Sequence, residues 1–299
     1  GGPLGKELAG GKGLNMKRLI VLLGVAGVSF SAILVRWSTA PSLVLVFYRV
    51  LFASILLGPL AWVHREEFRT LETREFWLSL ISGAFLGVHF ACYFESLRWT
   101  SIAAAVVLVD TEVLFVALAS VLIFRKRLGG RAWLAVLLAF GGSVIVAMSG
   151  SSSAVDAFWG NLLALAGSLC MAVYTMLGSV CRKRLSTTVY TLLVYLTAAV
   201  TILAAALLNG TAVIGWSPVN LLTALGMAVF CTLLGHSIFS WGLKYLPPAF
   251  ISTACLLEPV LASVWGLLLF RERPGLQVML GGALILLGIG LYSREEEQR

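Results

Sequence analysis

The sequence predicts an all-α, polytopic membrane protein in which ten transmembrane helices form two inverted five-helix repeats. The first observation is composition: 59% of the 299 residues are hydrophobic, 12% are charged and the mean hydropathy is +0.95, whereas soluble domains carry about 25% charged residues. The second is a series of apolar runs of membrane-spanning length, separated by short polar breaks. The third is a similarity between the two halves of the chain, which is typical of secondary transporters.

The spans follow one another with little sequence between them. A bilayer core needs about 20 apolar residues per helix, and the breaks carry Arg, Lys, Asn, Pro or Gly. The predicted spans are 19–37, 42–62, 76–97, 102–124, 132–149, 158–180, 188–208, 219–243, 248–270 and 276–292. Because almost nothing is left outside the bilayer, we expect no domain that binds ATP or nucleic acid.

The repeat is clearest where Gly242–Arg273 aligns with Ser96–Arg127. The offset of 146 residues places Glu258 on Glu112 in the middle of an apolar run. Five spans per repeat is an odd number, so the second repeat crosses the membrane in the opposite sense to the first.

We divide the chain into three parts. Residues 1–15 are Gly-rich and lack an apolar run, so we expect a disordered tail or a segment foreign to the natural protein, with Met16 as the natural start. Residues 16–149 form the first repeat, and residues 150–299 form the second repeat with a short C-terminal tail.

The distribution of Lys and Arg predicts the orientation. With the N-terminus in the cytoplasm, most of the basic residues fall on the cytoplasmic side. The outer side then holds only Arg36, Arg98, Arg271 and Arg273. We therefore predict a multi-pass protein of the plasma membrane, of the bacterial inner-membrane type, with both termini in the cytoplasm.

The sequence contains none of the common catalytic or cofactor motifs. It has no Gly-rich phosphate loop, no HExxH helix and no GxSxG elbow. The five cysteines have no metal-ligand spacing, and we interpret them as small packing residues. We therefore expect no cofactor and no metal, and no enzymatic activity.

Ionisable residues inside the spans are the candidate functional groups, because a charge at mid-helix costs about 2.5–3.5 kcal/mol and usually faces a cavity or a partner. They are Arg49, His89, Glu95, Asp110, Glu112, His236 and Glu258. The offset of 146 places His236 on Phe90, next to His89, which predicts a polar layer around the axis relating the repeats.

Two glutamates are the predicted centre of this layer. Pro259 removes a helical hydrogen bond directly after Glu258, and the freed carbonyls beside the carboxylate could hold a proton, a cation or an amine. The alternative is a structural kink in which Glu258 pairs with a nearby Ser or Arg. Glu112 is followed by Val113 instead, and the same two roles stay open for it.

Asp110 lies about 200° around a helix from Glu112, so the two cannot face one cavity equally well. We expect one of them to pair structurally, with Arg49 as counter-ion. Arg49, Asp110 and Pro259 are therefore assigned structural or coupling roles. His89 and His236 are either satisfied core imidazoles or proton-exchanging groups.

Aromatic residues cluster near the polar positions. Tyr93, Tyr174, Trp241 and Trp265 are predicted to line the solute path, because aromatic faces with carboxylates suit an organic cation. A lipid-facing or core position is the alternative for each. Glycines such as Gly83, Gly142 and Gly288 are interpreted as sites of close helix packing.

The chain resembles the ten-helix, EamA-type members of the drug/metabolite transporter superfamily. The similarity is carried by FYRVLFAS at 47–54, by the stretch RWTSIAAAVVLVDTEVLFVALASVLIFRKRL, and above all by KYLPPAFISTACLLEPVLASVWGLLLFRERP. Two positions depart from the family pattern, which usually has proline at Val113 and an acidic residue at Lys126. The resemblance implies a central cavity between the repeats, alternating access, and transport of amino acids, amines, nucleotide sugars or similar metabolites.

These observations together predict a secondary active transporter of a small polar organic metabolite, with an amino acid or organic amine favoured and proton coupling expected. The predicted solute-binding residues are Glu112, Glu258, His89, His236, Tyr93, Tyr174, Trp241 and Trp265. An intramembrane enzyme using Glu and His as acid and base, or a channel, is the alternative. The expected partners are the solute, protons and the lipid bilayer; the sequence leaves the oligomeric state open.

Overall fold

The computed structural model describes residues 3–31, 34, 37–99, 108–123, 125, 127–147, 157–271 and 275–297. Every regular element in these ranges is a helix, which confirms the predicted all-α class. Five helices are long and apolar enough to cross a membrane: Ser42–Val63, Thr73–Ser96, Trp159–Cys181, Thr187–Leu208 and Pro218–Gly242. Two shorter apolar helices cover Gly130–Ile145 and Met279–Tyr292. The protein is therefore a multi-pass membrane protein.

The first half of the chain folds into a series of helices with short connections. In order they are α1 (Pro3–Ser29), α3 (Ser42–Val63), α4 (Arg65–Arg69), α5 (Thr73–Trp99), α7 (Glu112–Leu122) and α8 (Gly130–Ala147). The prediction of 42–62 as a span agrees closely with α3. In contrast, the expected tail 1–15 is helical from Pro3 onward and continues directly into the first span.

The second half repeats this order with more interruptions. Its elements are α9 (Ala157–Cys181), α10 (Thr187–Leu208), α11 (Pro218–Gly226), the π-helix η1 (Met227–His236), α12 (Ser237–Gly242), α13 (Pro248–Cys255), α14 (Glu258–Phe270) and α15 (Leu276–Glu297). The single span predicted at 219–243 contains the π-helix, and the one predicted at 248–270 is two helices. The Ser186 hydroxyl caps α10 by accepting a hydrogen bond from the Val189 N–H at 3.3 Å.

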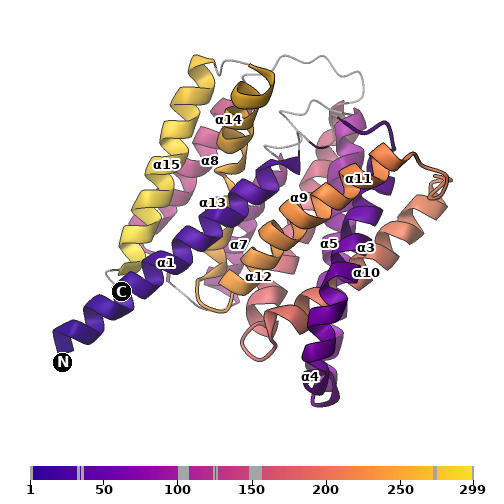
Figure 1. Cartoon of the computed structure of the whole chain (residues 1–299). Helices are drawn as coiled ribbons and strands as arrows, with labels where there is room; N and C mark the ends of the chain where they lie inside the picture. The colour runs from indigo at the N-terminus through magenta and orange to yellow at the C-terminus, as the bar shows by residue number, and fades with distance from the viewer. Residues whose placement is uncertain are drawn as a thin grey trace.

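Equivalent helices of the two halves run in opposite directions. In Figure 1, α5 rises from α4 at the lower end of the bundle, whereas α11, η1 and α12 descend toward that end. Both termini lie at the same lower end. This arrangement is the inverted repeat that the odd number of spans per repeat predicts.

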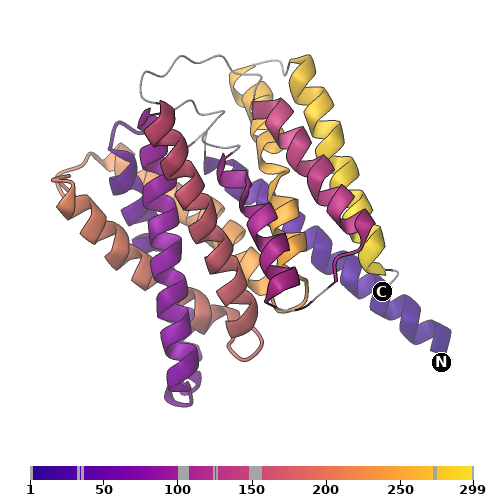
Figure 2. The ribbon, with the colours of Figure 1, turned by 180° about the vertical axis from the view of Figure 1, so that it is seen from behind.

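Two hydrophobic clusters hold the bundle together, and each uses helices from both repeats. The first cluster is built mainly from α1, α7, α8, α12, α13 and α15. The second cluster is built mainly from α3, α5, α9, α10, α11 and η1. From behind (Figure 2), α8 stands beside α15 on one side of the molecule and α5 beside α9 on the other. The packed bodies are thus not the two halves of the sequence.

Glycines allow the closest helix contacts, as the sequence predicts. A Cβ atom at Gly83 of α5 would lie 2.5 Å from the Val194 carbonyl oxygen of α10, and one at Gly288 of α15 would lie 2.6 Å from the Ala135 carbonyl oxygen of α8. Real Cβ atoms do not approach a backbone oxygen so closely, so only glycine fits at these crossings.

Candidate functional site

A cavity lies where the two hydrophobic clusters meet. Val28 and Phe239 of its wall belong to the first cluster, and Phe90, Phe94 and Met171 belong to the second. The full lining is Val28, Ser31, Arg49, His89, Phe90, Tyr93, Phe94, Val109, Asp110, Glu112, Met171, His236, Phe239, Ser252, Cys255 and Glu258. One cation, three carboxyl groups and two imidazoles therefore share one space inside the bundle.

Both glutamates stand at the first residue of a helix that follows an interruption. A turn at Thr111 precedes Glu112 and α7, and a turn at Leu256 and Leu257 precedes Glu258 and α14. The free N–H groups and the dipole of a helix N-terminus stabilise negative charge. Non-helical backbone at membrane depth is tolerated where it lines a cavity, and both turns occur beside this one.

The cause of the interruption differs between the repeats. Pro259 has no N–H to donate to the Cys255 carbonyl, so its backbone position accounts for the second turn; its side chain lies outside the described residues. In the first repeat the Thr111 hydroxyl donates to the Leu108 carbonyl at 2.5 Å and pairs with the Ser168 hydroxyl at 2.8 Å. In the first repeat, which lacks the proline, the Thr111 hydroxyl therefore competes with backbone N–H groups for a carbonyl acceptor.

The three carboxyl groups have different surroundings. Asp110 accepts a hydrogen bond from the Ser143 hydroxyl at 2.7 Å, so it is the carboxylate with a structural partner. Glu112 is 6% exposed, and its Oε2 has no hydrogen-bond partner among the described residues. Glu258 lines the cavity and is half-buried.

Arg49 does not pair with Asp110, and that expectation is wrong. No carboxylate in the described part of the chain forms a salt bridge with Arg49. Its Nε donates to the Thr232 hydroxyl at 2.7 Å, and its guanidinium lies 4.7 Å from the centre of the Phe90 ring. Asp110 takes its hydrogen bond from a neutral hydroxyl instead, so the cation is not neutralised by that carboxylate.

The two histidines line the same cavity, from α5 and from the end of η1. His89 Nδ1 lies 3.0 Å from the Gly167 carbonyl, which only accepts, so Nδ1 carries the proton and donates it. His236 Nδ1 has no partner among the described residues, and its ring meets Phe90 and Phe239 edge-on at 5.4 and 5.7 Å. One imidazole is thus fixed by the backbone, and the other has a free nitrogen.

Of the four aromatic residues predicted to line the solute path, only Tyr93 is part of the cavity lining. Tyr93 lines the cavity and stacks on His89, with 6.1 Å between ring centres. Tyr174 packs edge-on against His236, with 6.5 Å between ring centres, and its hydroxyl pairs with that of Ser240 at 3.1 Å. Neither Trp241, which packs on Tyr245, nor Trp265 is part of the lining.

Trp265 instead joins two helices. Its Nε1 donates to the Ser29 hydroxyl at 2.6 Å, and its ring stacks on Phe30 with 4.4 Å between centres. These contacts link α14 to the end of α1, which is a packing role.

Several lining residues were missed by sequence reasoning. Phe90 could have been found, because the offset of 146 places it on His236. Ser252 lies six residues before Glu258, and Thr232, which is the partner of Arg49 and not part of the lining, lies four residues before His236. Ser31, Cys255 and Met171 carry no signal that separates them from ordinary packing residues.

A buried cavity lined with ionisable groups from two inverted repeats defines the class of membrane solute transporters. The chain belongs to the EamA-like transporter family, whose family model matches residues 16–148 and 158–294. This membership agrees with the resemblance noted in the sequence.

Relatives of this chain carry transporter names without a stated solute. An uncharacterized transporter of Archaeoglobus fulgidus is 24% identical over 259 residues, covering 85% of this chain and 88% of the relative. The uncharacterized transporter YxxF of Bacillus subtilis is 25% identical, with 84% and 81% covered. A solved structure titled "Crystal structure of protein" has a TM-score of 0.78 at 18% identity and covers 95% of this chain and 98% of its own. That likeness concerns the fold alone.

Proposed function

We propose that this protein is a secondary active transporter of a small polar organic metabolite with an amino group, working by alternating access and coupled to protons. The observation that carries the proposal is the pair Glu112 and Glu258. They hold equivalent positions in the inverted repeats, begin helices after interruptions, and line one cavity.

Carboxylates at the cavity wall are suited to an amine or to protons. Three carboxyl groups and one arginine line the cavity, and Phe90, Tyr93 and Phe239 present aromatic faces to the same space. A cation gains from both kinds of group. The free nitrogen of His236 is a further place for a proton to be exchanged.

The packing supports alternating access by two bodies that each combine both repeats. The cavity lies between the first and second hydrophobic clusters, so a change in their relative tilt alters access to it. We propose the plasma membrane, with both termini in the cytoplasm. The termini share one end of the bundle with the basic connection between α9 and α10.

Counterflow into proteoliposomes tests the proposal. Vesicles with purified protein are loaded with an unlabelled amine or amino acid, and uptake of the labelled compound is followed with and without an imposed pH gradient. We expect saturable counterflow and a rate that depends on the gradient. The Glu112→Gln, Glu258→Gln double variant should lose both, with a melting temperature no lower than that of the natural sequence. Unchanged flux and pH dependence in that variant would contradict the proposal.

A further inference from the structure

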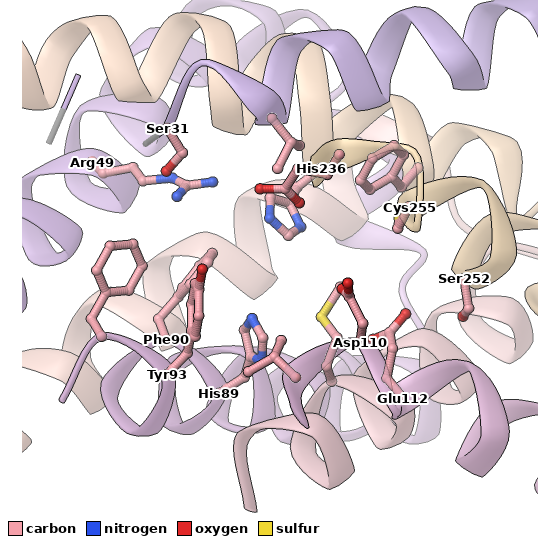
Figure 3. A pocket seen from close by; sticks show the side chains of 16 residues that line it. Ser31, Arg49, His89, Phe90, Tyr93, Asp110, Glu112, His236, Ser252 and Cys255 are labelled. Carbon is pink, nitrogen blue, oxygen red and sulfur yellow. The ribbon is translucent and has the colours of Figure 1, made fainter. Parts of the chain in front are cut away.

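The cavity carries a cationic side chain at one end and carboxyl groups at the other. Figure 3 shows Arg49 and Ser31 at one end, and Asp110, Glu112 and Ser252 at the other. The positive group is therefore separated from two carboxyl groups by the width of the cavity. A solute that fills this space meets opposite charges at its two ends.

Arg49 forms no salt bridge with a described carboxylate, and Glu258 is the lining carboxyl group whose charge acts on it across the cavity. Its side chain is 1% exposed, and its Nη2 has no hydrogen-bond partner among the described residues. Thr232 and Phe90 are neutral, so neither compensates the charge. A buried guanidinium is costly unless it is paired, and its planar fork matches a carboxylate with two parallel hydrogen bonds.

The opposite end offers acceptors for a cation. Glu112 Oε2 and Ser252 Oγ are both buried and form no hydrogen bond with any other described residue, while the two side chains interact with each other. Asp110 beside them is already held by Ser143. An ammonium group has three N–H donors that could use these oxygens.

We propose that the solute carries an anionic and a cationic group, that Arg49 binds the anion, and that the carboxylates at the Glu112 end bind the cation. This inference rests on the proposed transport function. It makes Arg49 a determinant of specificity rather than a structural counter-ion.

The repeat explains why the solute binds in one orientation. The offset of 146 places Arg49 on Tyr195, whereas Glu112 falls on Glu258. The Tyr195 hydroxyl is occupied by Ser237 at 2.9 Å and by the Thr232 carbonyl at 3.3 Å. Both repeats therefore carry a glutamate at the equivalent position, but only the first carries an arginine. The cavity thus has one end, at Arg49, that is suited to an anion.

Matched trios of compounds test the inference. The probes are alanine, ethylamine and propionate; leucine, 3-methylbutylamine and 4-methylpentanoate; and phenylalanine, phenethylamine and 3-phenylpropionate. Within a trio only the charged groups differ. Binding to purified protein is measured by thermal shift, and transport by competition in counterflow. We expect the zwitterion of at least one trio to bind about tenfold or more tighter than both singly charged partners.

The Arg49→Gln variant separates a binding role from a structural one. It should weaken binding of the zwitterion about tenfold or more and leave the amine within about twofold, so their ratio collapses. Arg49→Lys keeps the charge without the fork and should recover part of the preference, which covers the case in which the glutamine variant does not fold.

Three results would overturn the inference. If the amine binds as tightly as the zwitterion in every trio, the solute needs no anionic group, while the proposed transport function stands. If the Arg49 variants that fold lower affinity for both compounds equally, the arginine has a structural role. Absence of binding by all nine probes would contradict both this inference and the proposed function.

Discussion

The first repeat is interrupted at Thr111 and the second at Leu256 and Leu257, positions that the offset of 146 brings together. Only the second interruption has a proline beside it. At the first interruption, the Thr111 hydroxyl donates a hydrogen bond to the Leu108 carbonyl and pairs with the Ser168 hydroxyl of α9. Two different local causes place a glutamate at a helix N-terminus beside the same cavity. The position of the interruption is therefore the shared property, and proline is one way to obtain it.

A second contrast concerns the helices that carry the histidines. α5 is a regular α-helix through His89, whereas its counterpart contains η1, which ends at His236. Thr232 inside η1 donates to the Met227 carbonyl five residues back at 3.3 Å and accepts from Arg49. The π-helix thus supplies the contact that holds the arginine, and π-helical turns are frequent at functional sites.

The largest effect should come from exchanging the two glutamates separately. Glu258→Gln is expected to reduce solute transport roughly 30- to 150-fold, equal to the loss of about 2–3 kcal/mol from a charged hydrogen bond. Glu112→Gln should cost about tenfold and should raise the melting temperature, because it removes a buried charge whose Oε2 lacks a partner. Counterflow rates and detergent thermal melts check this. Equal losses of transport in the two variants would contradict this order and mean that the two glutamates contribute equally to transport.

Proline substitution tests whether the first interruption already exists without proline. Val113→Pro should cost only about 1 kcal/mol, since it falls in the first turn of α7, where N–H groups have no helical acceptor. The control, Ala117→Pro in the middle of α7, should cost about 3 kcal/mol or more. Thermal unfolding of both variants gives the comparison. A similar cost for both would show that α7 is continuous through Thr111.

Glycine substitution tests whether α8 and α15 pack as equivalents. Gly142→Ala and Gly288→Ala should each lose about 1–3 kcal/mol, because the new Cβ meets the backbone of the partner helix. Gly141→Ala and Gly290→Ala are matched controls with nothing within 4 Å of the new atom. Melting temperatures should fall only for the first pair. A fall for the controls would contradict the packing.

A last comparison concerns the two ends of the bundle. Asn220 at the start of α11 accepts from the Ser38 hydroxyl at 2.8 Å and the Thr39 N–H at 2.9 Å. At the other end, Arg184 pairs with Glu72 at 3.0 Å and Glu75 at 3.2 Å near the start of α5. The two connections are thus tied down in equivalent ways, one by neutral hydrogen bonds and one by charges.

Asn220→Ala should cost about 1–3 kcal/mol because the side chain is 4% exposed and leaves buried partners unpaired. Arg184→Gln should cost about 0.5 kcal/mol, and its cost should fall further in high salt, because the arginine is 59% exposed. Thermal melts of both variants at low and high salt measure the two losses and their salt dependence. A salt-insensitive loss for Arg184→Gln would show that its ion pairs are not screened.

Much of the site could be predicted from the chain. Glu112, Glu258, His89 and His236 were found because a charged or polar residue inside an apolar run is costly and is rarely placed there without use. The assignment of Trp241, Trp265 and Tyr174 to the walls does not agree with the lining. An aromatic side chain is equally at home in a helix contact, as the stacking of Trp265 on Phe30 illustrates.

The sequence by itself determined the membrane class, the two repeats and the depth of the carboxylates, because run length, composition and offset are properties of the linear chain. Only the tertiary structure decided which side chains share the cavity. One residue turns a helix by about 100°, so small changes such as the π-helical turns of η1 redirect the side chains that follow. In the folded protein Arg49 meets Thr232 of η1 and Phe90 of α5, and Asp110 meets Ser143 instead.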